Sequence, residues 1–434
     1  QEALKKHHTN ILQQDAKLIT CSKIDAVCDS HRSHFLYYLC SIMNNNSLYI
    51  FNPQHDLALA NYSPYYHAPK SAITFAHDLA LLPLWYSSTH ADIVAETPDL
   101  NWLDEQKKRF NQSVYIHTKN TTEYKHVHTW GWDPAVRYTL LQLGVSPSCL
   151  PSDDALNKIK ELSHRQLAAE GMFYLRNAIK TIEFPEPAMR FNTLDTIVEF
   201  TQKYPEIVLK APYSGSGKGL YWNKGPLTES LAGWCKRTIA KQGCVMGEEA
   251  LQKIQDFAME FHSDEHGHIV FSGYSLFQTD DAGIYKSNML LSDKAIERAL
   301  ECYISIDTLH SIQQHLIDFF ETNIAGHYQG YFGVDMFIYK QVDGTFAINP
   351  CVEINMRMTM GMVARLFYDH FVANGKQGTF TIEHGLTEGE LLTKHQILTN
   401  QYPLIIKDGK IEAGYLSLCP INEKTFYSAS VIIN

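Results

Sequence analysis

The sequence has little positive charge to offer a polyanion. Its 434 residues include 37 Lys and Arg against 47 Asp and Glu, which gives a formal net charge of −10 at pH 7. Nucleic acids and anionic membrane surfaces select proteins with basic patches, so we expect this chain to bind neither. Any smaller anionic ligand must be held by a few Lys and Arg side chains that the fold brings together.

Two further absences concern cysteine pairs and long apolar runs. The nine cysteines form no CxxC pair and show no repeated spacing, which favours reduced thiols in a cytoplasmic protein. The sequence contains no run of about eighteen apolar residues, so no membrane span is expected. Residues 1–46 are polar and rich in histidine, and we interpret them as an N-terminal extension of unknown role.

What is present is an ordinary globular composition, with 45% hydrophobic and 19% charged residues. Between residues 47 and 150, short strand patterns alternate with helical ones, and one helix is expected to begin at Asp133-Pro134 and to end near Gly144. That alternation predicts a small, Rossmann-like parallel α/β domain over residues 47–150. The segment 53–69 is expected to be a loop within it.

A different pattern begins at residue 151. A helical segment, with Ser152 or Asp153 as its N-cap, precedes a strand, a glycine-rich loop and a second strand. Long antiparallel strands come next, with turns expected near Asp264–Gly267 and near Asp343-Gly344. We expect one domain with antiparallel sheets.

The domain boundaries derive from these patterns. The antiparallel domain is expected to span residues 151–370, and the strands of residues 371–434 should complete or cover its sheet. The predicted fold class is therefore α/β in the first domain and α+β in the remainder of the chain.

The stretch "VLKAPYSGSGKGL" carries the first chemical signal. A strand at 206–210 delivers Lys210 into a glycine-rich loop, whose backbone N–H groups can turn together around an anion, with Lys218 adding charge. It is not a Walker A loop, because Pro212 and Gly219 stand where that motif needs a glycine and a Ser or Thr. A flexible surface hairpin is the alternative.

The second signal is "CVEINMR", in which Glu353, Asn355 and Arg357 occupy every second position. Strand side chains alternate between faces, so these three share one face. A carboxylate and an amide oxygen suit Mg²⁺, and a guanidinium suits a phosphate. An amphipathic edge strand would show the same pattern.

The preceding strand carries a single carboxylate, Asp335. A two-residue turn at Asp343-Gly344 would set Asp335 opposite Val352, so that it faced away from Glu353. A metal site that uses both carboxylates therefore predicts an irregular turn or a bulge in this hairpin.

In order along the chain, these features resemble the ATP-grasp superfamily, mainly carboxylate–amine and carboxylate–thiol ligases. The resemblance covers roughly Pro151 to Arg365 and rests on "LSHRQLA", "VLK", "SGSGKG", "VMGEEALQKIQDF", Asp335 and "EINMR". The segment "NPQHDLALAN" also resembles uncharacterised bacterial proteins that carry this domain. Two departures from the family pattern are Arg165, where lysine is commoner, and Met356, where proline is usual.

The resemblance implies a role for each matching residue. ATP would be held at its phosphates by Arg165, Lys210 and the loop residues Ser214, Gly215, Ser216, Gly217 and Lys218, at adenine by Glu248, Ala250 and Leu251, and at ribose by Asp256. Mg²⁺ or Mn²⁺ would be bound by Asp335, Glu353 and Asn355. Arg357 and Lys210 would be catalytic, with Arg357 stabilising the transferring phosphoryl group or the tetrahedral intermediate.

The implied reaction is an ATP-dependent ligation. ATP phosphorylates a small-molecule or peptide carboxylate, ADP leaves, and an amine displaces the phosphate. A small-molecule kinase and a non-catalytic ATP-binding module are the alternatives. His55 and Asp56 come directly after the first strand and would either contact the substrate or cap the next helix. The substrates and the oligomeric state, a homodimer included, are left open.

Overall fold

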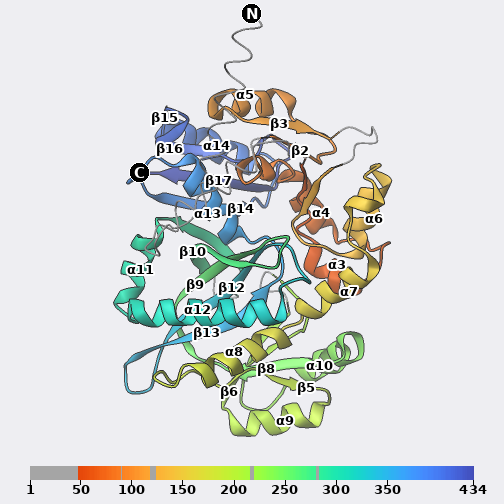
Figure 1. The fold of residues 1–434 in the computed structure, drawn as a ribbon, viewed down its shortest axis with the longest axis vertical. Helices are drawn as coiled ribbons and strands as arrows, with labels where there is room; N and C mark the ends of the chain where they lie inside the picture. The colour runs from red at the N-terminus through yellow and green to blue at the C-terminus, as the bar shows by residue number, and fades with distance from the viewer. Residues whose placement is uncertain (1–46, 89, 118–123, 216–218, 280–282) are drawn as a thin grey trace, which may run out of the picture. The chain divides into compact units, whose positions relative to one another are not determined.

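The computed structural model describes residues 47–88, 90–117, 124–215, 219–279 and 283–434. Residues 45–434 cluster as one compact unit. The described residues form one parallel sheet of four strands, then antiparallel sheets of four and nine strands (Figure 1). The expected fold class, a parallel α/β portion followed by antiparallel sheets, is confirmed.

The parallel sheet has the strand order β3-β2-β1-β4. Its strands are β1 Ser47–Ile50, β2 His90–Ile93, β3 Ser113–Ile116 and β4 His126–Thr129. Its helices are α3 His55–Asn61, α4 Lys70–Asp78, α5 Leu100–Phe110 and α6 Pro134–Gln142, with a 3₁₀ turn at Leu82–Trp85. Asp133 caps α6 by accepting from the N–H groups of Ala135 and Val136.

The expectation of a loop over residues 53–69 is wrong, because α3 occupies His55–Asn61. Leu57 to Ala60 are all strong helix formers. The helix ends at Tyr62, which adopts a left-handed backbone conformation with φ of 57°. The sequence between Pro53 and Pro64 is short, but it forms a helix because burial of Ala58 and Leu59 in the fold stabilises it.

The smaller antiparallel sheet has the order β5-β8-β6-β7. Its strands are β5 Met189–Phe191, β6 Glu206–Lys210, β7 Leu220–Lys224 and β8 Val245–Glu249. Helices α9 Leu194–Lys203 and α10 Glu229–Gln242 share an apolar core with it. The helical segment before this sheet is divided into α7 Asp153–Leu162, capped by Ser152, and α8 Gln166–Ala178, so that Arg165 lies at the break.

The nine-stranded sheet has the order β13-β12-β9-β10-β11-β14-β17-β16-β15. Its strands are β9 Gln252–Ser263, β10 Ile269–Thr279, β11 Tyr285–Leu290, β12 Gly330–Lys340, β13 Phe346–Asn355, β14 Gly378–His384, β15 Ile405–Lys407, β16 Lys410–Ser417 and β17 Tyr427–Ile433. The accompanying helices are α11 Asp293–Glu301, α12 Ile306–Asn323, α13 Met360–Phe371 and α14 Glu390–Gln401. The C-terminal strands continue the sheet through the pairing of β11 with β14.

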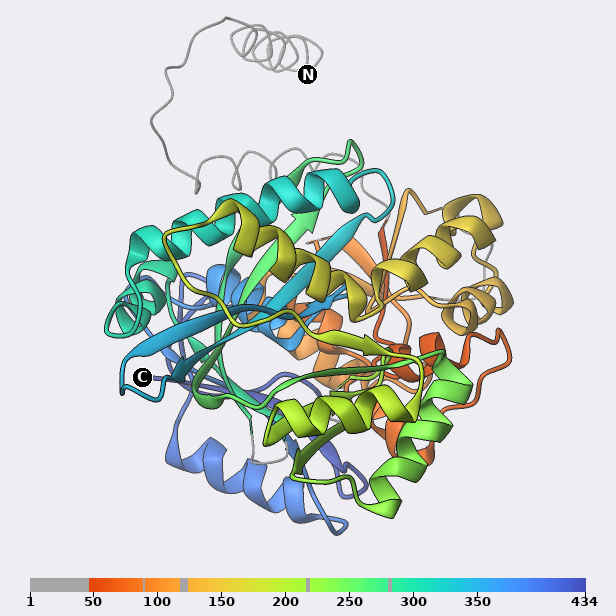
Figure 2. The same ribbon diagram turned by 90° about the horizontal axis from the view of Figure 1, so that it is seen from below.

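Along β9, an interior strand of this sheet, the side chains alternate between its two faces. Phe257, Met259 and Phe261 point into the apolar core beneath α8 and α12, which lie side by side (Figure 2). The intervening residues, Asp256, Ala258 and Glu260, therefore point to the opposite face. That second face is partly covered by α13, and it carries the predicted metal ligands.

Candidate active site

The β12–β13 hairpin is irregular at the two predicted positions. Lys340 pairs with Phe346, which leaves the five residues 341–345 in the turn. Farther along, one residue separates Asp335 from Phe337 on β12, whereas three separate their partners Glu353 and Asn349 on β13. The predicted irregular turn or bulge is confirmed, and Asp335 lies directly opposite Glu353.

A proline explains where the ladder breaks. Pro350 is one of the three residues between these partners on β13, and it has no N–H to donate to β12. The odd turn alone places Asp335 and Glu353 on the same face, and the bulge then brings them to the same rung. The hairpin is thus built to bring two carboxylates together.

The two carboxylates face each other across the hairpin, and each affects the ionisation of the other. Burial, and then the charge of Glu353, raise the pKa of Asp335 to about 7, although a hydrogen bond from Asn355 opposes that rise. Two carboxylate groups and an amide oxygen on adjacent strands are a donor set that fits Mg²⁺ or Mn²⁺. Such an ion would remove the repulsion that the pair now experiences.

Lys210 ends β6 and is 4% exposed. Its Nζ lies 2.5 Å from Oε1 of Glu248, on the neighbouring strand β8. Glu248, predicted to meet adenine, thus neutralises the predicted phosphate-binding lysine in this structure. Ala250 and Leu251 come next and form the connection from β8 to β9.

Arg165 joins three parts of the site. Its Nε donates to the carbonyl oxygen of Ala211 at 2.9 Å, and one terminal nitrogen donates to the carbonyl and hydroxyl oxygens of Ser214 at 2.9 and 3.1 Å. The other terminal nitrogen forms an ion pair of 2.8 Å with Glu353. The arginine thereby connects the start of the glycine-rich loop to β13.

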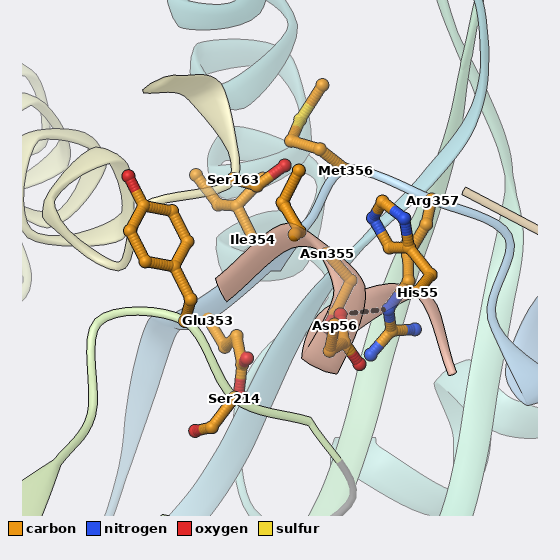
Figure 3. A pocket seen from close by; sticks show the side chains of 11 residues that line it. His55, Asp56, Ser163, Ser214, Glu353, Ile354, Asn355, Met356 and Arg357 are labelled. Atoms are coloured by element: carbon orange, nitrogen blue, oxygen red, sulfur yellow. Dashed lines mark hydrogen bonds and ion pairs between the residues drawn. The ribbon is translucent and has the colours of Figure 1, made fainter. Parts of the chain in front are cut away.

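Helix α3, which follows β1 of the parallel sheet, contributes Asp56 to the same pocket. Oδ1 of Asp56 accepts from Nε of Arg357 at 2.9 Å, and both line a pocket together with Ser214, Glu353 and Asn355 (Figure 3). Burial acts to raise the pKa of Asp56, but the Arg357 guanidinium, together with His55 and Arg165, holds that pKa below its usual value. This carboxylate is therefore charged. Its Oδ2 lies so close to Gly215 that a Cβ there would collide with it.

His55 has a different environment, although it also borders the pocket. It is 1% exposed, and its Nδ1 lies 3.2 Å from Oδ2 of Asp133. Neither His55 nor Asp56 caps α3, because the N-cap residue is Gln54 and makes no side-chain bond. The capping alternative is therefore wrong for both residues.

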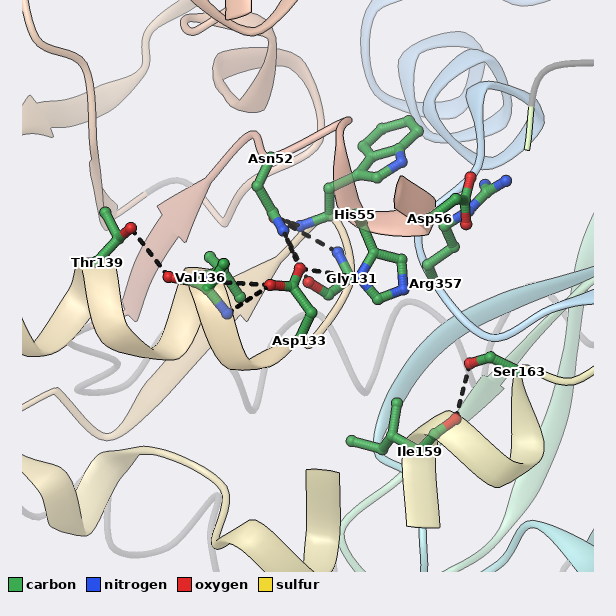
Figure 4. Close-up of polar contacts among 12 residues, drawn as sticks. Asn52, His55, Asp56, Gly131, Asp133, Val136, Thr139, Ile159, Ser163 and Arg357 are labelled. Carbon is green, nitrogen blue, oxygen red and sulfur yellow. Dashed lines mark hydrogen bonds and ion pairs between the residues drawn. The ribbon is translucent and has the colours of Figure 1, made fainter. Parts of the chain in front are cut away.

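A hydrogen-bonded network attaches the Arg357 segment to the parallel sheet. Asn52, at the end of β1, donates to the carbonyl of Gly131 at 2.8 Å and accepts from the N–H of Trp130 at 2.8 Å (Figure 4). The carbonyl of Trp130 in turn accepts from the N–H of Met358 at 2.8 Å. The residue after Arg357 is thus fixed by the segment that follows β4 of the parallel sheet.

The remaining predicted residues fall into two groups. Ser216, Gly217 and Lys218 lie outside the described residues. Asp256 lies on the site-facing side of β9, where Lys253 forms an ion pair of 2.7 Å with it and Thr279 donates a hydrogen bond of 3.0 Å. Its predicted contact with ribose stays a prediction.

Sequence reasoning missed Glu260. This residue shares the site-facing side of β9 with Asp256, is 1% exposed, and accepts hydrogen bonds of 2.9 and 3.0 Å from Thr359. The signal was present, since a single acid within "FAMEF" is as costly to bury as Asp335 is in its own strand.

No protein-family model matches this sequence, and no curated protein sequence matches it. Solved structures do. A biotin carboxylase–β,γ-ATP complex from Campylobacter jejuni is 10% identical, with a TM-score of 0.49 over 90% of this chain and 88% of that one. N5-carboxyaminoimidazole synthetase from Staphylococcus aureus complexed with ADP is 11% identical, with a TM-score of 0.47 over 89% of this chain and 92% of that one. D-alanyl-alanine synthetase A from Vibrio cholerae is 12% identical, with a TM-score of 0.38 over 76% of this chain and 94% of that one.

At 10 to 12% identity the similarity concerns the fold, and it assigns no reaction or substrate to this chain. Within the described residues, no helix is long and apolar enough to cross a membrane.

Proposed function

We propose that this chain is an ATP-dependent ligase of the ATP-grasp type, which activates a substrate carboxylate and couples it to an amine. The observation that carries the proposal is the bulged hairpin, which sets Asp335 opposite Glu353 and leaves Asn355 and Arg357 beside them. A bulge that gathers two repelling acids costs stability, and a metal–phosphate site gives it a purpose.

The pairing of charges supports a site for an anionic ligand. Arg165, Lys210 and Arg357 are each held by a carboxylate, Glu353, Glu248 and Asp56 respectively. Nucleotide phosphates would take over the cations. Asp335, Glu353 and Asn355 would hold Mg²⁺ or Mn²⁺, and the ion would offset the negative charge of the phosphates.

The reaction that we propose has two group transfers. A substrate carboxylate oxygen attacks the γ-phosphorus of ATP, the bond to the bridging oxygen breaks, and ADP leaves. The amine nitrogen then attacks the acyl carbon, the C–N bond forms, and the C–O bond to phosphate breaks while the amine loses a proton. Lys210 and Arg357 would orient the phosphoryl group and offset its charge throughout.

Calorimetry with Mg-ATP tests the site. We expect magnesium-dependent binding in the micromolar range, which Lys210→Ala and Glu353→Gln each weaken by about tenfold or more. The matched controls are Lys236→Ala and Glu301→Gln, at exposed positions on α10 and at the end of α11. A folded protein that binds no Mg-ATP, or binds it equally well in all variants, would refute the proposed site.

Product analysis then separates the ligase from the kinase. A ligase releases ADP faster when both a carboxylate and an amine are supplied, and its product contains both. A kinase needs only one acceptor and leaves a stable phosphoester. Binding of Mg-ATP without ADP release, for any combination of carboxylate and amine tested, would favour the non-catalytic module.

A further inference from the structure

The proposed ligation leaves Glu260 without a role, although its surroundings are specialised. Glu260 is on β9, an interior strand of the nine-stranded sheet, and its partners on both neighbouring strands are glycines, Gly273 and Gly333. A Cβ at Gly333 would come within 2.6 Å of Oε2 of Glu260, and one at Gly361 of α13 would collide with Oε1. Glycines on neighbouring elements therefore make the room for this carboxyl group.

The carboxyl group has one described hydrogen-bond donor. Oγ1 of Thr359 lies 2.9 Å from Oε1 and 3.0 Å from Oε2, and the same hydroxyl accepts from the N–H of Met362 at 2.9 Å as the N-cap of α13. Burial raises the pKa of Glu260 to about 8, so that the group is mainly uncharged at neutral pH. An uncharged carboxyl group can be buried at this position, because it can both accept and donate a hydrogen bond.

Thr359 lies two residues beyond Arg357, in the short connection from β13 to α13. The N–H of Arg357 bonds to the carbonyl of Asn355 at 2.7 Å, and the N–H of Met358 bonds to Trp130 at 2.8 Å. The Glu260–Thr359 contact is the next attachment along the chain. The backbone at Arg357 is thus fixed at three successive residues: by the carbonyl of Asn355, by the carbonyl of Trp130 and, through Thr359, by Glu260.

We infer that Glu260 is a positioning residue for Arg357: by holding Thr359, it fixes the turn that aims the guanidinium at the transferring phosphoryl group. This inference rests on the proposed function. Glu260 is 1% exposed and does not line the pocket that Arg357 lines, so it is not placed to touch a substrate itself. Its effect must therefore pass through Arg357, and it should appear only with ligands that carry the transferable phosphoryl group.

Two matched pairs of variants test this. Glu260→Leu removes the acceptor, whereas Glu260→Gln keeps an uncharged group of similar size. Thr359→Val removes the hydroxyl, whereas Thr359→Ser keeps it, and this second pair serves if the leucine variant does not fold. Calorimetry measures the binding of Mg²⁺-β,γ-imido-ATP and of Mg-ADP, which lacks the γ-phosphoryl group.

We expect Glu260→Leu and Thr359→Val to weaken the binding of the triphosphate analogue about tenfold and that of ADP less than about twofold. Gln and Ser should stay within about threefold of the unmodified protein. In an Arg357→Ala background, the losses caused by Leu and Val should disappear. Equal losses for both nucleotides, or losses that persist without Arg357, would mean that Glu260 serves only the fold, which overturns the inference.

A measurement without nucleotide keeps the two proposals apart. The Nε–H of Arg357 donates to Asp56, so its NMR signal, assigned from Arg357→Ala, should exchange slowly with water. We expect that exchange to accelerate in Thr359→Val and not in Thr359→Ser. An unchanged rate in Thr359→Val overturns the positioning role even if no nucleotide binds, whereas absent nucleotide binding by itself refutes the proposed function.

Discussion

Replacing Arg165 with lysine tests how the glycine-rich loop is held. Lysine is the commoner residue at this position in the superfamily that the chain resembles, and it keeps the positive charge. It cannot, however, reproduce a guanidinium that reaches Ala211, Ser214 and Glu353 from three different nitrogens. The substitution therefore separates the geometry of Arg165 from its charge.

The expected loss can be worked from these contacts. A hydrogen bond to a charged group contributes about 1.5–3 kcal/mol. A lysine ammonium could keep the ion pair to Glu353 or the bonds to the loop, but not both, because different nitrogens of the guanidinium make them. We expect the free energy of unfolding of the nucleotide-free protein to fall by about 2 kcal/mol. The affinity for Mg-ATP should fall by less than about tenfold, since a cation remains.

Urea denaturation and calorimetry on the same preparations measure both quantities. Arg165→Ala is the reference, because it leaves Glu353 without its partner and should be the less stable of the two variants. If Arg165→Lys is as stable as the unmodified protein, the contacts to Ala211 and Ser214 contribute nothing, and the description of Arg165 as the fastening of the loop is refuted.

Two further predictions concern pH and a glycine. Because the folded-state pKa of Glu260 is about 8, above its ordinary value of 4.5, the native state holds a proton that the unfolded chain releases. Stability should therefore fall as pH rises from about 5 to 8, by at most about 1.4 kcal/mol per pH unit, and Glu260→Gln should remove this part of the slope. Thermal unfolding across that range measures it, and equal slopes in both proteins would contradict the assigned burial. Gly215→Ala should displace Asp56 and weaken Mg-ATP binding, because the added methyl group collides with that carboxylate. The control is Gly233→Ala within α10, where the added methyl group meets only the flexible end of Arg237. This control should stabilise the helix by roughly 0.5–1 kcal/mol. Equal nucleotide affinity in the two variants would show that the contact between Gly215 and Asp56 is unimportant.

Much of the site could be predicted because its signals are local. Alternation within one strand was enough to put Glu353, Asn355 and Arg357 on one face. The sequence showed that Asp335 and Glu353 can share a face only if the hairpin has an irregular turn or a bulge. It did not show where the bulge lies or how large it is, because these depend on how β12 and β13 pair and not on Pro350 alone.

Other features depend on contacts between distant segments. Asp56 and Arg357 are 301 positions apart, and nothing in either segment indicates that they meet. The break before α8 was not predicted, because residues 163–165 lie inside an unbroken helical pattern, and Arg165 is drawn to the glycine-rich loop there. Glu260 could have been predicted from the sequence, since it is the single acid within the apolar run "FAMEF", just as Asp335 is the single acid in its own strand.

The hydrogen bond between Met358 and Trp130 has a consequence for how this protein can be taken apart. It ties the connection that follows β13 and carries Arg357 to the carboxyl end of the parallel sheet, and Asn52, which follows β1, accepts a hydrogen bond from the N–H of the same Trp130. A fragment that begins after residue 150 would keep every predicted nucleotide and metal ligand and yet lose the support of its guanidinium. The antiparallel portion is therefore not a transplantable module. Exchanging residues 47–150 for another sequence would require substitutes for this backbone contact, for the Asp56–Arg357 ion pair and for the apolar core that the two portions share.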